Sequence, residues 1–454
     1  MGQNLIIIGA GAGGASIAAE VRRRDPSIAV AMIEAGPFIS TAACPMPYFI
    51  GDLIKDVNHL VARTPEKFRE SGVDVRINTR VEGINEAKGV VELSDGTALP
   101  FDILALATGT DAFVPPIPGA DQEGIFTLKR LPDAVNIKHF IEKEKCRKAV
   151  IVGGGFIGME MCEALTTKNI ETSVIDLAPR PVMRWDSEFT KVIIEEMERH
   201  GVPFLPETKT LSIEKGTGYR FHLNTNRNEM DADLIIMAVG IRPVNNLAKE
   251  LGLDLGKNGA VKVNFAQRTS KENIYAAGDC CEVYHLISKQ WVNIPLGDVA
   301  NKQGRVAGIN IGGDSMMFPG VVGAQSFRIF NLEVAAAGID EREAATSGYS
   351  PACTIIWDSA ITGSMPNANE VGVKLVADRS TGKLLGAQAI GKTGVVSRIN
   401  TLACALWAGM GLQEIGYLDL AYAPPFSSAW DPIHVACQRL LRDMQSGAVG
   451  ACDL

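Results

Sequence analysis

One segment pattern occurs twice in this chain, and it constrains the fold more than any other feature. Residues 4 to 34 contain an apolar strand, a glycine-rich turn, a helix and a second strand, and the same order returns 144 residues later from 148 to 176. These are the parts of a βαβ unit, whose two strands lie parallel in one sheet. The repeat predicts an α/β fold with two doubly wound, Rossmann-like domains.

The first copy has the glycine spacing of a dinucleotide site. Gly9, Gly11 and Gly14 form the pattern G-x-G-x-x-G after a strand and before a helix. We expect Gly9 to form the turn, Gly11 to admit phosphate and Gly14 to let the helix approach the strand, so that backbone N–H groups and the helix dipole hold a pyrophosphate. Glu34 ends the second strand, where a carboxylate accepts hydrogen bonds from ribose hydroxyls.

The second copy carries the same pattern at Gly153, Gly155 and Gly158, with Asp176 in the carboxylate position. A carboxylate there repels a 2′-phosphate, which favours NADH. Arg180 lies close enough to accommodate that phosphate, so NADPH stays open. Two dinucleotide sites in one chain indicate electron transfer between two cofactors, and we expect FAD in the first site and a nicotinamide in the second.

The pattern after residue 322 changes to alternating strands, at 354–357, 370–376 and 384–390, followed by a helix at 395–408. This predicts a third, α+β domain. A buried strand near residue 275 is expected to return to the first domain. The predicted division is a first domain in two parts (1–113 and 247–322), a nicotinamide domain (114–246), a third domain (323–445) and a flexible tail (446–454).

Charge and composition exclude several classes of partner. The chain has 44 Lys and Arg against 52 Asp and Glu, and it has no dense basic run, so we expect no nucleic acid partner. No apolar stretch reaches the roughly 18 residues of a membrane span, and the apolar run at 5–8 leads into glycines rather than a cleavage site. We therefore expect no membrane association and a cytoplasmic location. No cysteine and histidine cluster has ligand spacing, so no metal site is predicted.

Cys44 is the cysteine whose position points to chemistry. It follows Glu34 by ten residues and comes directly before a helix predicted from Pro47 to Leu53. A helix N-terminus lowers the pKa of a thiol, and the thiolate is the nucleophile toward sulfur. A cysteine next to a flavin would then exchange electrons through a mixed disulfide or persulfide. The alternative is a buried, inert cysteine.

The other cysteines have weaker signals. Cys162, Cys404 and Cys437 fall on apolar helix faces and are predicted to be core residues. The neighbours Cys280 and Cys281, and Cys452 in the tail, keep a redox role only as an alternative.

Further motifs carry a resemblance that covers nearly the whole chain. They are Ala107-Thr108-Gly109, Gly240-Ile241-Arg242-Pro243 and Tyr275-Ala276-Ala277-Gly278-Asp279. With the two glycine patterns they resemble the flavin-dependent pyridine nucleotide disulfide oxidoreductases, in the single-cysteine branch with coenzyme A disulfide reductase, NADH oxidase and NADH-dependent persulfide reductase. The resemblance implies that Thr108, Gly109 and Gly240 contact cofactor and that Asp279 touches the ribityl chain of FAD.

The same resemblance implies roles for the reacting groups. Phe156 gates the nicotinamide and Glu160 contacts it, while Cys44 is the redox centre. Tyr422, in Leu420-Ala421-Tyr422-Ala423-Pro424-Pro425, is implied to reach Cys44 of the partner subunit, which makes the protein a homodimer. The third domain is then a dimerisation domain.

The substrate side of the resemblance is less complete. Arg22 resembles arginines that meet coenzyme A phosphates, with an ordinary helix end as the alternative. Ser40, which begins the segment that contains Cys44, is a candidate substrate contact. Relatives have asparagine where this chain has Ala43. They also have Tyr-Tyr-Pro-Gly where this chain reads Ser364-Met365-Pro366-Asn367. The loss of that tyrosine weakens the case for coenzyme A disulfide as substrate, and coenzyme A remains a candidate ligand.

We therefore expect an FAD-dependent NAD(P)H oxidoreductase that reduces a small disulfide, persulfide or polysulfide through Cys44. Two alternatives remain open. One is an NADH oxidase that reduces oxygen while Cys44 cycles through sulfenic acid. The other is a redox flavoprotein that passes electrons to a protein partner.

Overall fold

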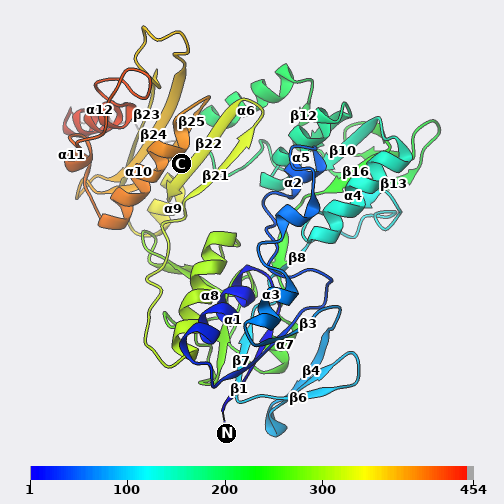
Figure 1. Cartoon of the computed structure of the whole chain (residues 1–454). Helices are drawn as coiled ribbons and strands as arrows, with labels where there is room; N and C mark the ends of the chain where they lie inside the picture. Colours follow the sequence, from blue (N-terminus) through cyan, green and yellow to red (C-terminus); the bar gives the residue numbers. More distant parts are fainter. Residues whose placement is uncertain (1, 447–454) are drawn as a thin grey trace.

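The computed structural model describes residues 2–446, which form three units (Figure 1). The first unit is built on a parallel five-stranded sheet. In order across the sheet its strands are β18 (Ile274–Ala276), β7 (Ile103–Leu106), β1 (Asn4–Ile8), β2 (Ala29–Ile33) and β3 (Val73–Arg76). The side chains of 5–8 in β1 are buried, as in a strand covered on both faces. Since β18 joins this sheet, the first unit is discontinuous in sequence.

Two helices lie side by side on the first sheet, α1 (Ala12–Arg24) and α8 (Gly297–Ile311) (Figure 1). Glycine permits their close approach, because a Cβ on Gly304 would lie 2.3 Å from the carbonyl oxygen of Gly13. A smaller antiparallel sheet of three strands precedes β7 in the chain. The remaining elements of this unit are β4 (Val81–Asn85), η2 (Glu86–Lys88), β5 (Val90–Leu93), β6 (Ala98–Pro100), α3 (Pro65–Glu70), α7 (Asn246–Glu250), β19 (Val283–His285) and β20 (Gln290–Val292).

The second unit repeats the design of the first. Its parallel sheet has the order β12 (Phe204–Leu205), β11 (Glu171–Ile175), β10 (Lys148–Val152), β16 (Leu234–Met237) and β9 (Ile125–Phe126). The other elements are α4 (Leu131–Glu144), α5 (Phe156–Thr167), α6 (Ser187–Arg199), β13 (Thr210–Lys215), β14 (Phe221–Thr225) and β15 (Glu229–Ala232). A two-stranded antiparallel ribbon, β8 (Thr110–Ala112) with β17 (Ile241–Pro243), joins the two units.

The third unit is an antiparallel sheet with the order β21 (Gln325–Ile329), β22 (Leu332–Gly338), β25 (Leu384–Gly391), β24 (Glu370–Asp378) and β23 (Pro351–Ser359). Side chains alternate between its faces. Val334 and Ala336 enter a core shared with the second unit, whereas Ala335 and Ala337 pack toward the helices of the third unit. These helices are α9 (Glu341–Thr346), α10 (Val395–Ala408), α11 (Leu412–Ile415) and α12 (Pro432–Ser446).

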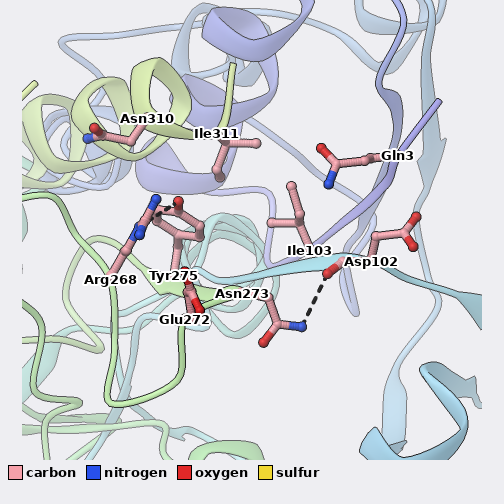
Figure 2. A pocket seen from close by; sticks show the side chains of 9 residues that line it. All are labelled: Gln3, Asp102, Ile103, Arg268, Glu272, Asn273, Tyr275, Asn310 and Ile311. Carbon is pink, nitrogen blue, oxygen red and sulfur yellow. Dashed lines mark hydrogen bonds between the residues drawn. The ribbon is translucent and has the colours of Figure 1, made fainter. Parts of the chain in front are cut away.

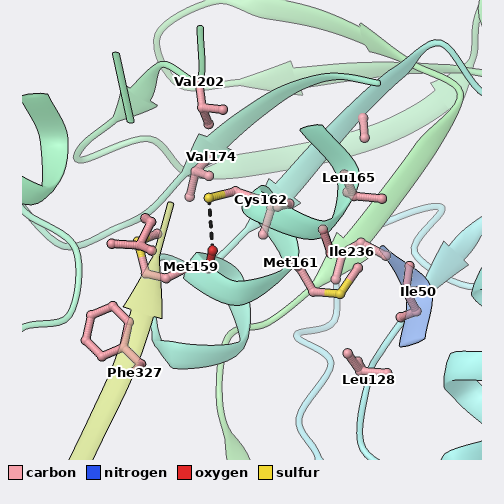
Figure 3. Packing of buried hydrophobic residues seen from close by; sticks show 14 of the residues in the cluster. Ile50, Leu128, Met159, Met161, Cys162, Leu165, Val174, Val202, Ile236 and Phe327 are labelled. Carbon is pink, nitrogen blue, oxygen red and sulfur yellow. Dashed lines mark hydrogen bonds between the residues drawn. The ribbon is translucent and has the colours of Figure 1, made fainter. Parts of the chain in front are cut away.

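The segment after Cys44 leaves the first unit and packs on the second (Figure 1). It contains α2 (Met46–Ile50) and η1 (Val57–Leu60). Figure 3 shows Ile50 in one cluster with Leu128 and Leu165 of the second unit and with Phe327 of β21. This segment lies within residues 1–113, the predicted first part of the first domain, and its buried side chains join the core of the second unit. The domain boundaries stay a prediction. All three parts meet where Cys44 lies.

Two predicted absences can be compared with the described residues. Within 2–446, no helix is long and apolar enough to cross a membrane. No three His, Cys, Asp or Glu side chains in the same range gather as metal ligands would. The predicted tail beyond Ser446, with Cys452, lies outside the described residues, and the cytoplasmic location stays a prediction.

Candidate active site

The first glycine turn has the shape expected of a phosphate cradle. Gly9 has a φ of +99°, and a Cβ on it would lie 2.2 Å from the carbonyl oxygen of Ala107. A Cβ on Gly14 would lie 1.9 Å from the oxygen of Gly9, so helix and strand touch only because glycine stands there. Around Gly11, at the N-cap of α1, nothing lies within 4 Å of a Cβ. The turn therefore offers open space and backbone N–H groups to a pyrophosphate.

Glu34 is fixed beside this turn by two backbone donors. Its Oε2 accepts from Ala10 N and its Oε1 from Gly36 N, both at 2.9 Å. Each carboxylate oxygen keeps a further lone pair, and the residue is partly exposed. The arrangement suits a carboxylate that also accepts from ribose hydroxyls, so the residues present fit a dinucleotide such as FAD.

The second glycine turn repeats this geometry. Gly153 has a φ of +111°, and a Cβ on Gly158 would lie 2.0 Å from its oxygen, while the space over Gly155 is open. Asp176 Oδ2 accepts from Gly154 N at 2.5 Å, and the other oxygen accepts from Ala178 N at 2.8 Å.

Arg180, the residue that left NADPH open, turns toward its own loop. Its guanidinium donates to the backbone oxygen of Trp185. The oriented group at the second cradle is therefore the carboxylate of Asp176.

Three motif residues lie where the first two units connect. Thr108 Oγ1 donates to Val244 O at 2.8 Å, and Val244 N donates to Gly109 O at 3.0 Å. Gly109 and Gly240 have φ angles of +69° and +118°, and no atom lies within 4 Å of a Cβ on either. These hydrogen bonds join the first and second units at the ribbon, and they leave room for a cofactor along it.

Asp279 makes an ion pair that its motif alone does not predict. Its Oδ2 lies 2.9 Å from Lys129 Nζ and 3.3 Å from Thr110 Oγ1. Lys129 stands just before α4, so it connects the second unit to the motif of the first. Sequence reasoning missed this residue because no motif marks a lone lysine near a helix start, and only the fold brings it to Asp279.

Cys44 lies immediately before α2, whose N-cap is Pro45. The residue is exposed in the single chain, yet enough protein atoms surround its sulfur that loss of water raises the pKa of the thiol. The negative charge of Glu160 raises this pKa further, and Lys129 opposes it. The lowered thiol pKa expected from the helix is wrong for the chain alone, because α2 has only five residues and its effect does not outweigh desolvation and a nearby carboxylate.

Phe156 and Glu160 stand on one face of α5. The ring of Phe156 packs edge-on against Trp185 and Phe327, with centroids 5.4 and 5.2 Å apart. Burial, and then the charge of Glu163, raise the pKa of Glu160 to about 7. A carboxyl group with this pKa both binds and releases a proton at neutral pH. The nicotinamide contacts implied for Phe156 and Glu160 stay predictions.

Arg22 has a structural role. Its guanidinium donates to the carbonyls of Ser71, Pro26 and Ile28, at 3.1, 2.9 and 2.9 Å. These bonds use Nε and Nη1 of the guanidinium at the C-terminal end of α1, the end away from the glycine turn. The arrangement supports the alternative of an ordinary helix end, and the implied contact with a coenzyme A phosphate stays a prediction.

Ser40 takes a backbone conformation that is rare for serine, with a φ of +49°. Its N–H donates to Ala10 O at 2.7 Å, and its carbonyl accepts from Ala62 N at 2.9 Å. These bonds connect the first cradle to the chain that leads to Cys44. A strained residue so placed is typical of a functional segment, and a substrate contact by Ser40 stays a prediction.

Tyr422 is half-exposed in the single chain, on the stretch between α11 and α12. The exposed aromatic residues of the same region are Tyr417, Phe426 and Trp430. Such a surface suits contact with a second protein. The described chain alone does not place Tyr422 at Cys44, so the contact across subunits stays a prediction.

One of the three cysteines predicted to be core residues is not buried. Cys162 and Cys437 are buried as predicted, whereas Cys404 is exposed. It lies on the solvent side of α10 with Trp407, one turn further on, so the apolar pattern of that helix is wider than its buried face.

Cys280 and Cys281 are both buried, and each thiol contacts a backbone oxygen in the 277–278 turn. Neither is exposed to a substrate in this chain.

A cavity of about 420 Å³ lies in the first unit, away from both glycine turns. Figure 2 shows the residues that line it. Asp102 and Asn273 border it just before β7 and β18 begin, and Asn273 Nδ2 donates to Asp102 O at 3.1 Å. Ligands of open α/β sheets bind at the carboxyl ends of the strands. This cavity lies at the opposite ends and is separate from the candidate site.

Comparison with known proteins decides the family. Residues 3–304 match the pyridine nucleotide-disulphide oxidoreductase family, and residues 324–433 match the dimerisation domain of the same family. The chain belongs to the pyridine nucleotide-disulphide oxidoreductases. The predicted resemblance, fold class and enzyme class are thereby confirmed. Members of this family use FAD and NAD(P)H.

Relatives of this family member have informative names. The chain is 36% identical over 447 residues to the NAD(P)H coenzyme A polysulfide/persulfide reductase of Pyrococcus horikoshii, covering 97% of this chain and 100% of the relative. A solved NAD-dependent persulfide reductase from A. fulgidus superposes with a TM-score of 0.94 at 34% identity, covering 98% of this chain and 84% of the other. The reduced CoADR-RHD of Bacillus anthracis also gives 0.94, at 32% identity, covering 100% and 82%.

Proposed function

We propose that this chain is an FAD-dependent NAD(P)H oxidoreductase that reduces the S–S bond of a persulfide, a polysulfide or coenzyme A disulfide through Cys44. The observation that carries the proposal is the position of Cys44: it is exposed, it follows the first dinucleotide cradle, and it lies where the three units meet. The names of the relatives support the choice of substrate class.

FAD and a nicotinamide, when bound in the two cradles, supply a two-electron route from NAD(P)H toward this sulfur. The chain itself supplies the nucleophile. The Cys44 thiolate attacks one sulfur of the substrate, a bond forms between the two sulfurs, and the other sulfur leaves as a thiolate or sulfide. Lys129 is the cation that acts on the Cys44 thiolate in the described chain, so we assign it a supporting electrostatic role.

We infer NADH as the preferred reductant. The support is the carboxylate of Asp176, which two backbone N–H groups hold at the second cradle, and Arg180, which is bonded within its own loop. A carboxylate so oriented accepts from the ribose hydroxyls of NADH and repels the extra phosphate of NADPH.

We further propose a homodimer in which Tyr422 of one subunit reaches the active site of the other. The family's dimerisation domain supports the dimer. The half-exposed hydroxyl-bearing ring of Tyr422 supports its use at an interface, where it would hydrogen-bond the entering or leaving sulfur.

The test is anaerobic turnover of the wild type and of Cys44→Ser with coenzyme A disulfide, coenzyme A persulfide and polysulfide in parallel. We expect the wild type to oxidise NADH with at least one of them and Cys44→Ser to lose that activity. If the variant keeps full sulfur reduction, the proposal is wrong.

An oxygen arm of the same experiment addresses a second activity. A 30% identical relative from Methanocaldococcus jannaschii is named NADH oxidase. NADH consumption that follows oxygen uptake and ignores added disulfide would favour an oxidase instead.

A further inference from the structure

The reaction needs a proton besides the electron pair. Cleavage of an S–S bond to two thiols, or to a thiol and hydrogen sulfide, takes up two electrons and two hydrogens. The hydride from NADH brings both electrons and one hydrogen. One proton per turnover must therefore enter from the solvent.

A small cavity of about 90 Å³ lies between α2, α5 and β21, directly behind the segment that carries Cys44. Its polar wall residues are Tyr48, Glu160, Glu163, Thr167 and Arg328. The volume holds a few water molecules, and the polar walls give them hydrogen-bond partners. Water in this cavity can therefore supply protons close to the site.

Arg328 and Glu163 form a fixed pair on this wall. Arg328 Nη2 lies 2.8 Å from Glu163 Oε1, and Phe330 N donates to Glu163 Oε2 at 2.9 Å. The Glu163 carboxylate is therefore satisfied by the third unit. The guanidinium carbon of Arg328 also lies 6.0 Å from the centre of the Tyr48 ring.

Glu160 differs from Glu163. Within residues 2–446 no side chain or backbone group hydrogen-bonds its carboxyl, so this group keeps its donor and acceptor positions for water or a ligand. Its burial and the charge of Glu163 hold the pKa of Glu160 at about 7.

Tyr48 lines the cavity and lies close in sequence to the sulfur of Cys44. It lies on α2, four residues after Cys44, and burial is the main cause of its raised pKa. The charges of Glu160, Glu163 and Cys44 raise this pKa further, while Arg328 lowers it. The charges of Cys44, Glu160 and Glu163 thus all act on the Tyr48 hydroxyl. Asp279 and Lys129 are the other charged groups that act on Cys44.

We propose that Glu160 and Tyr48 form the path by which the proton passes from the cavity to the sulfur site. This inference rests on the proposed function, since it supplies the proton which S–S reduction consumes. Glu160 takes a proton from water in the cavity and gives it up toward the site. The Tyr48 hydroxyl accepts one proton as it donates another. Both residues therefore end each turnover in the protonation state in which they began it.

The test uses the FAD-loaded enzyme with NADH and polysulfide, without oxygen, and compares wild type with Glu160→Gln and Tyr48→Phe. The matched control is Glu198→Gln, on the exposed face of α6. We expect the wild-type turnover rate to fall as the pH rises through about 7, where Glu160 loses its proton. Glu160→Gln should lose this pH dependence. Both path variants should slow sulfide release about 10-fold or more, since a positioned proton donor contributes at least that much.

Two readouts separate proton transfer from cofactor binding. Reduction of the flavin by NADH alone, followed by absorbance, should be unchanged in Tyr48→Phe. Infrared spectra of the loaded enzyme should show a carboxyl band that titrates near pH 7 and is absent in Glu160→Gln. The solvent deuterium isotope effect on sulfide release should change in both path variants and stay at the wild-type value in Glu198→Gln.

The inference is overturned if Glu160→Gln and Tyr48→Phe keep the wild-type pH profile and isotope effect while Cys44→Ser is inactive. In that case the proposed function stands and only the proton path fails. If Cys44→Ser itself remains active on polysulfide, the proposed function fails instead.

Discussion

Three carboxylates, Glu34, Asp176 and Glu160, occupy the key positions of the candidate cofactor and active sites. Glu34 and Asp176 occupy equivalent places in the two βαβ units, and each is held by two backbone N–H groups. The glycine patterns predict both residues, because the spacing follows from the geometry of strand, turn and helix. Glu160 is different, since its pKa depends on burial by parts of the chain that no local pattern connects.

Replacing Asp176 with alanine tests the cofactor assignment. The change removes a charged acceptor and the anchor of the loop, and hydrogen bonds to charged groups contribute about 1.5–3 kcal/mol. We expect kcat/KM for NADH to fall roughly 10- to 100-fold and the value for NADPH to fall less or to rise. Equal losses for both cofactors would contradict the assignment.

Glu160 also makes stability depend on pH. Its pKa is raised from 4.5 to about 7, so the folded chain binds more protons than the unfolded chain between these values, and stability falls as pH rises through that range. Glu160→Gln should therefore stabilise the protein at pH 8 by about 3 kcal/mol relative to wild type, with little difference at pH 4. Urea unfolding at the two pH values measures this. The same gain at both values would show that the charge of Glu160 is not its cause.

At the scale of elements, α2 is the part whose place is least evident from sequence. Its helix is predicted from Pro47 onward, and the structure has it at Met46–Ile50. Its packing on α4 and α5 is not predictable, because Ile50 meets Leu128 and Leu165 only through long-range contacts. Cys404 shows the same limit, since periodicity does not reveal which part of an apolar helix face a neighbour covers.

An ion cluster holds α2 against the second unit. Asp52, just after the helix, lies 2.7 Å from Lys138 Nζ and 2.5 Å from Lys168 Nζ. The two lysines lower the pKa of Asp52 to about 2. Since the folded pKa is depressed, this contribution is present above about pH 4 and is lost as pH falls toward 2.

Asp52→Asn should cost about 1 kcal/mol at pH 7 after allowance for solvent screening, and less in high salt. The difference from wild type should vanish near pH 2. Chemical unfolding across pH and salt measures the change. A destabilisation that is constant down to pH 2 would point to a packing effect instead.

At the scale of the whole molecule, the three units pack together around the candidate active site. The sheet of the third unit gives one face to a core shared with the second unit and the other face to its own helices. The sequence predicts the existence of each unit through its patterns. It does not predict that Arg328 and Phe327 of β21 lie behind Cys44, because that contact depends on how the folded units pack against one another.

The exposed aromatic surface is expected to be buried in a dimer. Phe426 is 78% exposed in the single chain, and Phe426→Asp would place an unpaired charge in the interface, which is costly. We expect the wild type to sediment as a dimer and the variant to shift toward monomer, with loss of sulfur reduction. A variant that stays dimeric and fully active would place the interface elsewhere.

The central claim is that the sulfur of Cys44 reacts with the substrate. Anaerobic mixing with coenzyme A disulfide, without NADH, followed by mass analysis of the peptide that contains Cys44, tests it directly. Exchange forms a mixed disulfide at Cys44 and releases one coenzyme A thiolate. We predict a coenzyme A adduct on Cys44 that disappears after NADH is added, with none on the exposed Cys404. An unmodified Cys44 in enzyme that still reduces coenzyme A disulfide would contradict the claim.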